Sequence, residues 1–325
     1  MSKAVIIHAT GDPTVLKWED YDPGFPGPGA VRLRQEAVGL NFIDVYHRTG
    51  LYPLPALPAV LGLEGAGVVE AVGADVSGFK PGDRVGYAGI PPGAYAQVRC
   101  IPAHRLVLLP QGISTHAAAG MMLRGMTARY LLFGCYPVKR GDRILIHAAA
   151  GGVGAIVSQW ASYLGAEVIG TVGSVEKARL AEKHGCHHTI LYREIDFAER
   201  VKAITGGRGV DVVYDSVGQA TFMQSLDCLR PMGTMVSFGQ ASGAIAPVDI
   251  GVLAAKGSLF LTRPSLMAYT ASREDLLAHA NDLFAVVEKG AVRVTIGQTY
   301  ALEDAAQAHR DLESRRTTGS TVLIP

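Results

Sequence analysis

The feature that most constrains this chain is a regular alternation of short apolar strands and helices between residues 142 and 260. The first apolar run, Arg143–Ala149, leads into the glycine cluster Gly151-Gly-Val-Gly154, and a helical segment follows at once. Continuous apolar strands that alternate with helices predict a parallel sheet whose two faces are both covered. The sequence therefore predicts an α/β fold with a doubly wound domain of the dinucleotide-binding type.

The glycine cluster in this domain is suited to holding phosphates. Glycines between a strand and a helix let the backbone approach a pyrophosphate, and the helix N-terminus adds N–H donors and a positive dipole end. The cluster departs from the G-x-G-x-x-G pattern, because Ala149 stands where the first glycine would be. Taken alone, it could be only a tight strand–helix turn. Because it opens the whole run of strand–helix alternations, we interpret it as a dinucleotide site.

The end of the second strand bears on the choice of cofactor. Sites for NAD usually carry an acidic residue there, which binds the ribose 2′-hydroxyl. This strand, residues 167–172, is followed by Gly173-Ser174, with Lys177 and Arg179 one helical turn further on. The missing carboxylate and the nearby cations favour NADPH over NADH. Alternatively, both cations could lie on a solvated helix face, with Lys177 paired to Glu176.

The segments on either side of this domain have a different pattern. Residues 1–110 contain short alternating strands separated by Pro/Gly turns, which predicts a barrel-like arrangement. A helix is expected after a cap at Ser114 or Thr115. In the tail, Ser272 and Asp275 predict a capping box before a helix towards Lys289, and a second helix and a final strand follow. The tail could pack on the first segment, so the predicted domains are 1–125 with 264–325, and 126–263.

Composition limits the classes of function. The chain has 325 residues, 48% of them hydrophobic and 18% charged, with a formal net charge of +1. No strong field favours nucleic acid or an anionic membrane as partner, and no leader or membrane-spanning apolar run is found. The four cysteines (Cys100, Cys135, Cys186 and Cys228) form no C-x-x-C pair, which is typical of free thiols in a reducing compartment. We therefore expect a cytoplasmic enzyme.

One stretch carries a family pattern, Gly141-Asp-x-x-Leu-x-x-x-Ala-Ala-Gly-Gly-x-Gly154, which Gln159 and Ser162 complete. The stretches Asn41–Asp44, Gly62–Gly67 and Tyr214–Gly218 agree with it. These residues resemble the zinc-free quinone oxidoreductases, related to zeta-crystallin, of the medium-chain dehydrogenase/reductase superfamily, and the resemblance covers essentially the whole chain. It implies a GroES-like β-barrel catalytic domain made from both termini, with a Rossmann nucleotide-binding domain inserted.

The resemblance also assigns site residues. Those expected near the reacting centre are Asn41, Tyr46 and Tyr52. Those expected to bind NADPH are Asn41, Ile43, Thr127, Tyr130, Gly151, Gly152, Val153, Gly173, Ser174, Lys177, Tyr192, Ser216, Phe238, Gln240, Ser242, Phe260, Thr262, Arg263 and Arg315. Each has a plainer interpretation: the tyrosines could be barrel-surface residues, Ser216 and Phe238 strand-end packing, and Arg315 a solvated helix end. No residue is required to be the proton donor.

No metal site is expected. Zinc-using relatives have Cys where this chain has Asn41 and His where it has Leu63, and a leucine side chain cannot bind a metal. Without a Lewis acid, the expected acceptor is already electron-poor, such as a small quinone. Two other functions remain open: reduction of an enone or alkenal C=C bond, and a non-catalytic nucleotide- or RNA-binding role. The apolar segment Ser258–Arg263 could pair its free edge across a two-fold axis, which suggests a homodimer.

Overall fold

The computed structural model describes residues 1–325, which form two compact units. Unit 1 comprises residues 1–126, 270–288 and 294–325, and unit 2 comprises residues 127–269 and 289–293. Two short segments expected in the first domain, 264–269 and 289–293, therefore cluster with unit 2. Their contacts explain this, because Tyr269 stacks on Tyr130 and the backbone N–H of Arg293 donates to Gln159 at 2.9 Å.

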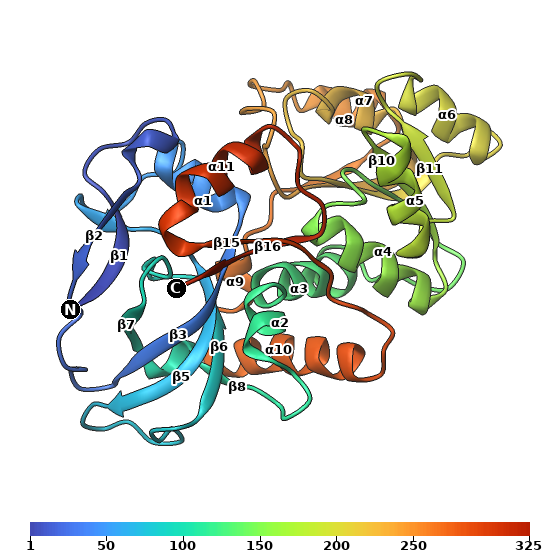
Figure 1. The fold of residues 1–325 in the computed structure, drawn as a ribbon. Coiled ribbons are helices and arrows are strands. Elements are labelled where there is room, and N and C mark those ends of the chain that lie inside the picture. The colour runs from blue at the N-terminus through green and yellow to red at the C-terminus, as the bar shows by residue number, and fades with distance from the viewer. The chain divides into compact units, whose positions relative to one another are not determined.

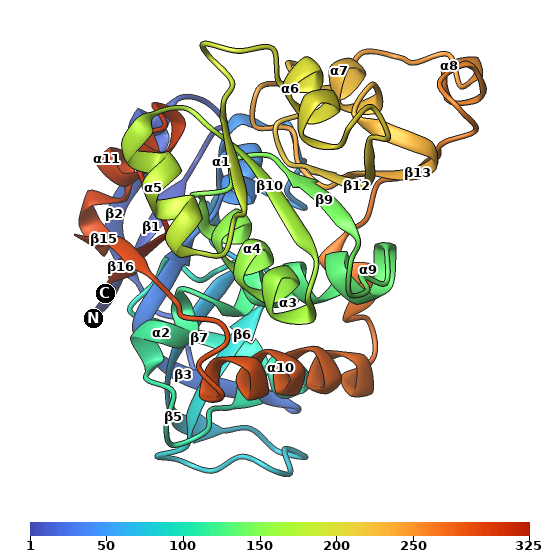
Figure 2. The same ribbon diagram turned by 90° about the vertical axis from the view of Figure 1, so that its right-hand side faces the viewer.

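Unit 2 is built around a six-stranded parallel sheet (Figures 1 and 2). Its strands are β9 (Arg143–Ile146), β10 (Glu167–Val172), β11 (His188–Leu191), β12 (Val210–Asp215), β13 (Leu229–Ser237) and β14 (Phe260–Thr262). They lie in the order β11-β10-β9-β12-β13-β14, and neighbouring strands pair in parallel. Numbered within the unit this is 3-2-1-4-5-6, the order of a Rossmann fold, and the predicted fold class is confirmed.

Helices cover this sheet and bury its central strands. They are α4 (Gly152–Leu164), α5 (Val175–Lys183), α6 (Phe197–Ile204), α7 (Phe222–Leu226), α8 (Gly251–Ala255) and α9 (Leu266–Tyr269). Figure 2 shows α4 and α5 alongside β10, and side chains of α6 and α7 pack on Leu145, Ile169 and Val213. The consecutive residues Ile144–Ile146 of β9 and Val212–Asp215 of β12 are fully buried, so both faces of the central sheet are covered.

Unit 1 is β-rich. A seven-stranded sheet has the order β15-β16-β3-β5-β6-β8, with β7 also paired to β3, and a three-stranded sheet has the order β2-β1-β4. The strands are β1 (Ser2–Ile7), β2 (Lys17–Tyr21), β3 (Ala30–Leu40), β4 (Ala59–Val60), β5 (Glu64–Val72), β6 (Arg84–Ala88), β7 (Val98–Pro102), β8 (Val107–Leu108), β15 (Ile296–Ala301) and β16 (Ser320–Ile324). Because β16 pairs antiparallel with β3, the two ends of the chain share one sheet (Figure 1).

The helices of unit 1 are α1 (Phe42–Thr49), α2 (Thr115–Ala119), α3 (Met122–Arg129), α10 (Arg273–Glu288) and α11 (Ala305–Glu313), with the last residues of α3 belonging to unit 2. The predicted cap is confirmed, since Ser114 Oγ accepts the N–H of Ala117. The predicted helix divides at Gly120 and ends in a π-helical segment, Tyr130–Cys135. No helix of the structure is both long and apolar enough to span a bilayer.

Candidate functional site

The glycine-rich turn of unit 2 joins the end of β9 to the start of α4. Gly151 is the N-cap of α4, and Ala148 has φ +54°, a left-handed conformation that is strained for a residue with a Cβ. A Cβ at Gly154 would lie 2.3 Å from the carbonyl oxygen of Ala148, so only glycine fits there. The turn therefore folds tightly under the first N–H groups of α4, which is the geometry that binds an anion.

The end of β10 supplies a second part of the same edge. Ser174 caps α5 by accepting the N–H of Lys177 at 3.3 Å. The hydroxyl of Tyr192 lies so close to Gly173 that an added Cβ would be 3.2 Å from it. No carboxylate lies at the end of β10 itself, but Glu176 on the first turn of α5 bonds to Ser174. Lys177 is partly buried on the same turn. The structure thus brings Gly173, Ser174, Lys177 and Tyr192 together at this turn.

The loops after β12 and β13 form a third part. The N–H of Ala241 donates to Ser216 at 3.1 Å and that of Ser242 donates to Val217 at 2.8 Å, so the two loops are joined. Arg263 follows β14 and donates to the carbonyl oxygens of Ser237 and Gly239, both at 2.9 Å. Ser216, Phe238, Gln240, Ser242, Thr262 and Arg263 therefore lie at the carboxyl ends of neighbouring parallel strands, the edge where such sheets bind ligands.

Thr127 and Tyr130 lie at the start of unit 2 and are both buried. The ring of Tyr130 stacks on that of Tyr269 with centroids 4.8 Å apart, and the Tyr269 hydroxyl is 3.5 Å from Cys135 Sγ. Tyr130 begins the π-helical segment, a local distortion that is frequent at functional sites.

In unit 1 the predicted residues gather on and after α1. The rings of Tyr46 and Tyr52 meet edge to face with centroids 5.1 Å apart, and His47 lies 6.3 Å from Tyr52. Asn41 caps α1, and its Nδ2 donates to Glu64 Oε2 at 2.8 Å. Arg315, expected to reach the 2′-phosphate, is exposed in unit 1 after α11 and has φ +61°.

A buried ion pair beside Asn41 was not predicted from the sequence. Arg124 Nη1 lies 3.2 Å from Glu64 Oε2, and the exposed fractions of the two side chains are 6% and 0%. Burial raises the pKa of Glu64, while Arg124 and the bond from Asn41 oppose this rise. In sequence, Arg124 is one more cation in a helix, and nothing local marks it as buried.

A second buried carboxyl, Asp44, begins a chain of hydrogen bonds. Asp44 Oδ2 accepts the N–H of Asn41 at 2.9 Å and the hydroxyl of Tyr95 at 3.1 Å, and Oδ1 has no partner. Tyr95 in turn lies 3.0 Å from His309 Nε2, and Arg48 lies 3.0 Å from His309 Nδ1. Burial is the main cause that raises the pKa of Asp44 to about 7. Asp44 thus titrates near neutral pH, unlike an exposed carboxyl.

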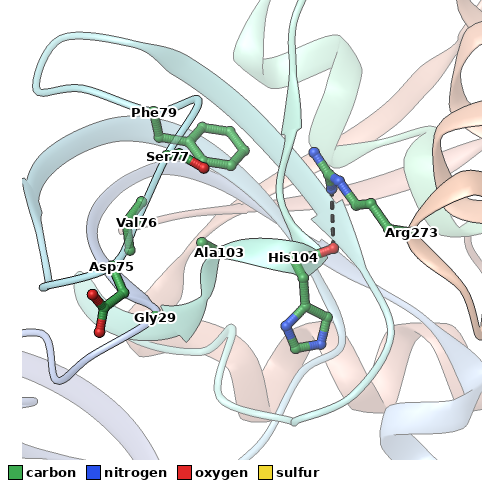
Figure 3. Close-up of a pocket in the computed structure, with 8 residues that line it drawn as sticks. All are labelled: Gly29, Asp75, Val76, Ser77, Phe79, Ala103, His104 and Arg273. Carbon is green, nitrogen blue, oxygen red and sulfur yellow. Dashed lines mark hydrogen bonds between the residues drawn. The ribbon is translucent and has the colours of Figure 1, made fainter.

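The pocket shown in Figure 3 lies elsewhere in unit 1. There Arg273 donates to the carbonyl oxygen of His104 at 3.0 Å, and its guanidinium lies 5.9 Å from the ring centroid of Phe79. No predicted site residue lines this pocket.

Comparisons with known proteins agree with the two units. A family model described as alcohol dehydrogenase GroES-like domain matches residues 27–111, and one described as zinc-binding dehydrogenase matches residues 152–284. A quinone oxidoreductase of Pseudomonas aeruginosa is 52% identical, with both chains covered in full. A 2-haloacrylate reductase of a Burkholderia species is 48% identical over 100% of this chain and 99% of that protein.

A solved structure described as Escherichia coli quinone oxidoreductase complexed with NADPH is also similar. It is 48% identical, covers 99% of this chain and 100% of its own, and has a TM-score of 0.98. A GroES-like domain combined with a dinucleotide-binding domain defines the medium-chain dehydrogenase/reductase superfamily. This chain belongs to that superfamily and, within it, to the family of the quinone oxidoreductases.

The zinc in the name of one family model does not fit the residues present. Leu63 is fully buried and has no ligand atom, and Asn41 already donates to Glu64. The carboxylate of Glu64 accepts bonds from Asn41, Leu123 and Arg124. The structure contains no group of three or more His, Cys, Asp or Glu side chains that could hold a metal ion. The side chains present therefore do not fit a catalytic zinc.

Proposed function

We propose that this protein is an NADPH-dependent reductase of small quinones that works without a metal. The observation that carries the proposal is the edge of the unit 2 sheet. There the N-terminus of α4 at Gly151–Gly152 can bind a pyrophosphate, and the capped turn Gly173–Lys177 can bind a 2′-phosphate. The relative of known structure that was solved with NADPH supports the choice of cofactor.

The residues present suggest how each part would act. Bound NADPH supplies a hydride. Backbone N–H groups at the start of α4 would hold the pyrophosphate, and Lys177 would pair with the 2′-phosphate. The partly exposed ring of Tyr52, which meets the buried ring of Tyr46 edge to face, offers aromatic surface against which a planar quinone can stack. Because a quinone is already electron-poor, the protein has to position the acceptor rather than polarise it.

The test is turnover with purified protein. NADPH oxidation should be rapid with 1,4-benzoquinone or 1,2-naphthoquinone and slow with a 2-alkenal. A protein that does not oxidise NADPH with any electron-poor carbonyl compound would contradict the proposal. A second candidate is reduction of an activated C=C bond, which the 48% identical 2-haloacrylate reductase supports. Faster turnover of the alkenal or of 2-chloroacrylate would favour this second function.

Replacing Lys177 by alanine should raise the KM for NADPH roughly 10- to 100-fold, since one charged contact to phosphate is lost. The KM for NADH should be nearly unchanged, because NADH has no 2′-phosphate. Steady-state kinetics with both cofactors checks this. Lys183→Ala, on the exposed last turn of the same helix, is the matched control and should alter neither KM. Equal losses with both cofactors would contradict the assignment.

We also propose a homodimer that forms through the edge of β14. That strand pairs only with β13, and Phe260 and Leu261 on it are 63% and 41% exposed. An apolar free edge of this kind favours pairing with a second copy. Sedimentation that gives the mass of one chain would refute this assembly. The four cysteines are free, which supports a cytoplasmic location that cell fractionation can test.

A further inference from the structure

The glycine-rich stretch contains a buried side chain to which the proposed function assigns no role. His147 follows β9 directly and is only 2% exposed. Its Nδ1 lies 2.9 Å from Thr171 Oγ1, and its Nε2 lies 2.9 Å from Ser225 Oγ. Both ring nitrogens thus form hydrogen bonds, although the imidazole is buried in the core of unit 2.

The direction of each bond in this group follows from the carboxylate at its end. Ser225 Oγ lies 3.1 Å from Asp215 Oδ2, and a carboxylate can only accept. The single hydroxyl hydrogen of Ser225 therefore goes to Asp215, so Ser225 Oγ must accept from His147 Nε2–H. His147 Nδ1 then carries no hydrogen and accepts from the Thr171 hydroxyl. Burial lowers the pKa of His147, which agrees with a neutral ring in this one tautomer.

Asp215 shapes the backbone that follows β12. Its Oδ1 accepts the N–H groups of Val217 at 2.7 Å and Gly218 at 3.0 Å, and its Oδ2 also accepts the hydroxyl of Thr221 at 2.7 Å. Gly218 has φ +89°, so this loop needs a conformation that glycine adopts readily. A fully buried carboxylate with four donors fixes the loop firmly.

The chain of bonds connects three neighbouring strands at one edge. Thr171 lies near the end of β10, His147 follows β9, and Asp215 ends β12. The order of the sheet reverses between β9 and β12, and ligands of doubly wound sheets bind at this switch point. The half of such a sheet that starts at β12 is the second mononucleotide-binding half.

We propose that Thr171, His147, Ser225 and Asp215 form a positioning network for the nicotinamide half of NADPH. The network ties the loop Ser216–Gly218 to the glycine-rich turn, so that both parts of the backbone keep their place when the cofactor binds. His147 and Ser225 are positioning residues, because both are buried and act through Asp215. This inference rests on the proposed function.

Comparing the affinities of each variant for two ligands separates this role from a general effect on folding. NADPH contains both halves of the cofactor, whereas 2′,5′-ADP contains only the adenosine half with its 2′-phosphate. Ser225→Ala and His147→Leu should each weaken NADPH binding about 10-fold, the effect of one or two hydrogen bonds. Binding of 2′,5′-ADP should stay within about 2-fold of wild type. His147→Gln, which keeps one donor and one acceptor, should restore most of the NADPH affinity.

Calorimetric titration of each purified variant gives both dissociation constants without turnover. Ser158→Ala is the matched control, since Ser158 is also fully buried in unit 2 but is bonded to Cys186 outside the network. It should leave both constants unchanged. If His147→Leu does not fold, Ser225→Ala provides the same comparison, with hydrogen exchange at the Val217 and Gly218 amides expected to be faster.

Two results would overturn the inference and leave the proposed function standing. One is an equal loss of affinity for both ligands in the network variants, and the other is an unchanged affinity of these variants for NADPH. Wild-type protein that binds neither ligand would refute the proposed function, and the network would then have no cofactor to position. The two failures are distinguished by the wild-type titration itself.

Discussion

Replacing Arg124 by methionine should destabilise the folded protein by roughly 3–5 kcal/mol, because it leaves a buried carboxylate without its countercharge. Glu64 is fully buried and pairs with Arg124 at 3.2 Å. Methionine fills part of the space of the arginine stem but carries no charge. Urea unfolding of wild type and variant near neutral pH measures the difference. A loss below about 1 kcal/mol would mean that the pair contributes little.

Two further measurements test the cause of this loss. In the variant, burial alone should hold the pKa of Glu64 above its ordinary value, so acidification should protonate Glu64 and recover stability as the pH falls. The double variant Arg124→Met/Glu64→Gln should also be more stable than Arg124→Met. A glutamine oxygen can still accept the N–H of Leu123, which now donates to Glu64 at 2.8 Å. A double variant no more stable than Arg124→Met would point to lost packing instead.

The fold could be predicted because its determinants are local. Strand–helix alternation gives the sheet, and the glycine cluster at Gly151–Gly154 marks its first crossover. The cap at Ser114 and the turn at Gly173–Ser174 are likewise read from adjacent residues. The unit boundaries were harder to predict. Tyr269 and Arg293 join unit 2 through contacts with Tyr130 and Gln159, and no periodic pattern in the sequence indicates these contacts.

The buried polar groups show the same limit at the site. His147 and Ser225 are 78 positions apart, and Arg124 and Glu64 are 60 apart. Such pairs form only because the fold brings their strands and helices together, so a single sequence gives no signal for them. Tyr46 and Tyr52, six positions apart, meet as neighbours on and after one helix and could be predicted together.

Replacing Asp44 by asparagine should change how stability depends on pH. Folding raises the pKa of Asp44 from 3.8 to about 7, mainly by burial, with Glu64 adding to the rise and Asn41, Tyr95 and Arg124 opposing it. Between these two pKa values the carboxyl is therefore protonated in the folded state but ionised in the unfolded state. Its contribution to stability is fully present below about pH 4 and is lost as the pH rises to about 7.

His309, connected to Asp44 through Tyr95, has the opposite dependence. Burial, with a smaller contribution from the charge of Arg48, lowers the pKa of His309 from 6.5 to about 3. Its contribution to stability is present above about pH 6.5 and is lost as the pH falls towards 3. Between about pH 4 and 6.5 the two groups change stability in opposite directions, each by about 1.36 kcal/mol per pH unit, and in the wild type they nearly cancel.

Asp44→Asn removes one side of this balance. For each protein, stability is compared with its own value at about pH 4. As the pH goes from about 4 to 6.5, the variant should gain roughly 3 kcal/mol more stability than wild type. Urea unfolding at several pH values measures this slope. Asp20→Asn, at a carboxyl with a 65% exposed side chain, should give a curve parallel to wild type. His309→Gln should reverse the sign of the slope relative to wild type, because of these two groups only Asp44 then titrates. Equal slopes in Asp44→Asn and wild type would show that Asp44 is ionised in the folded protein.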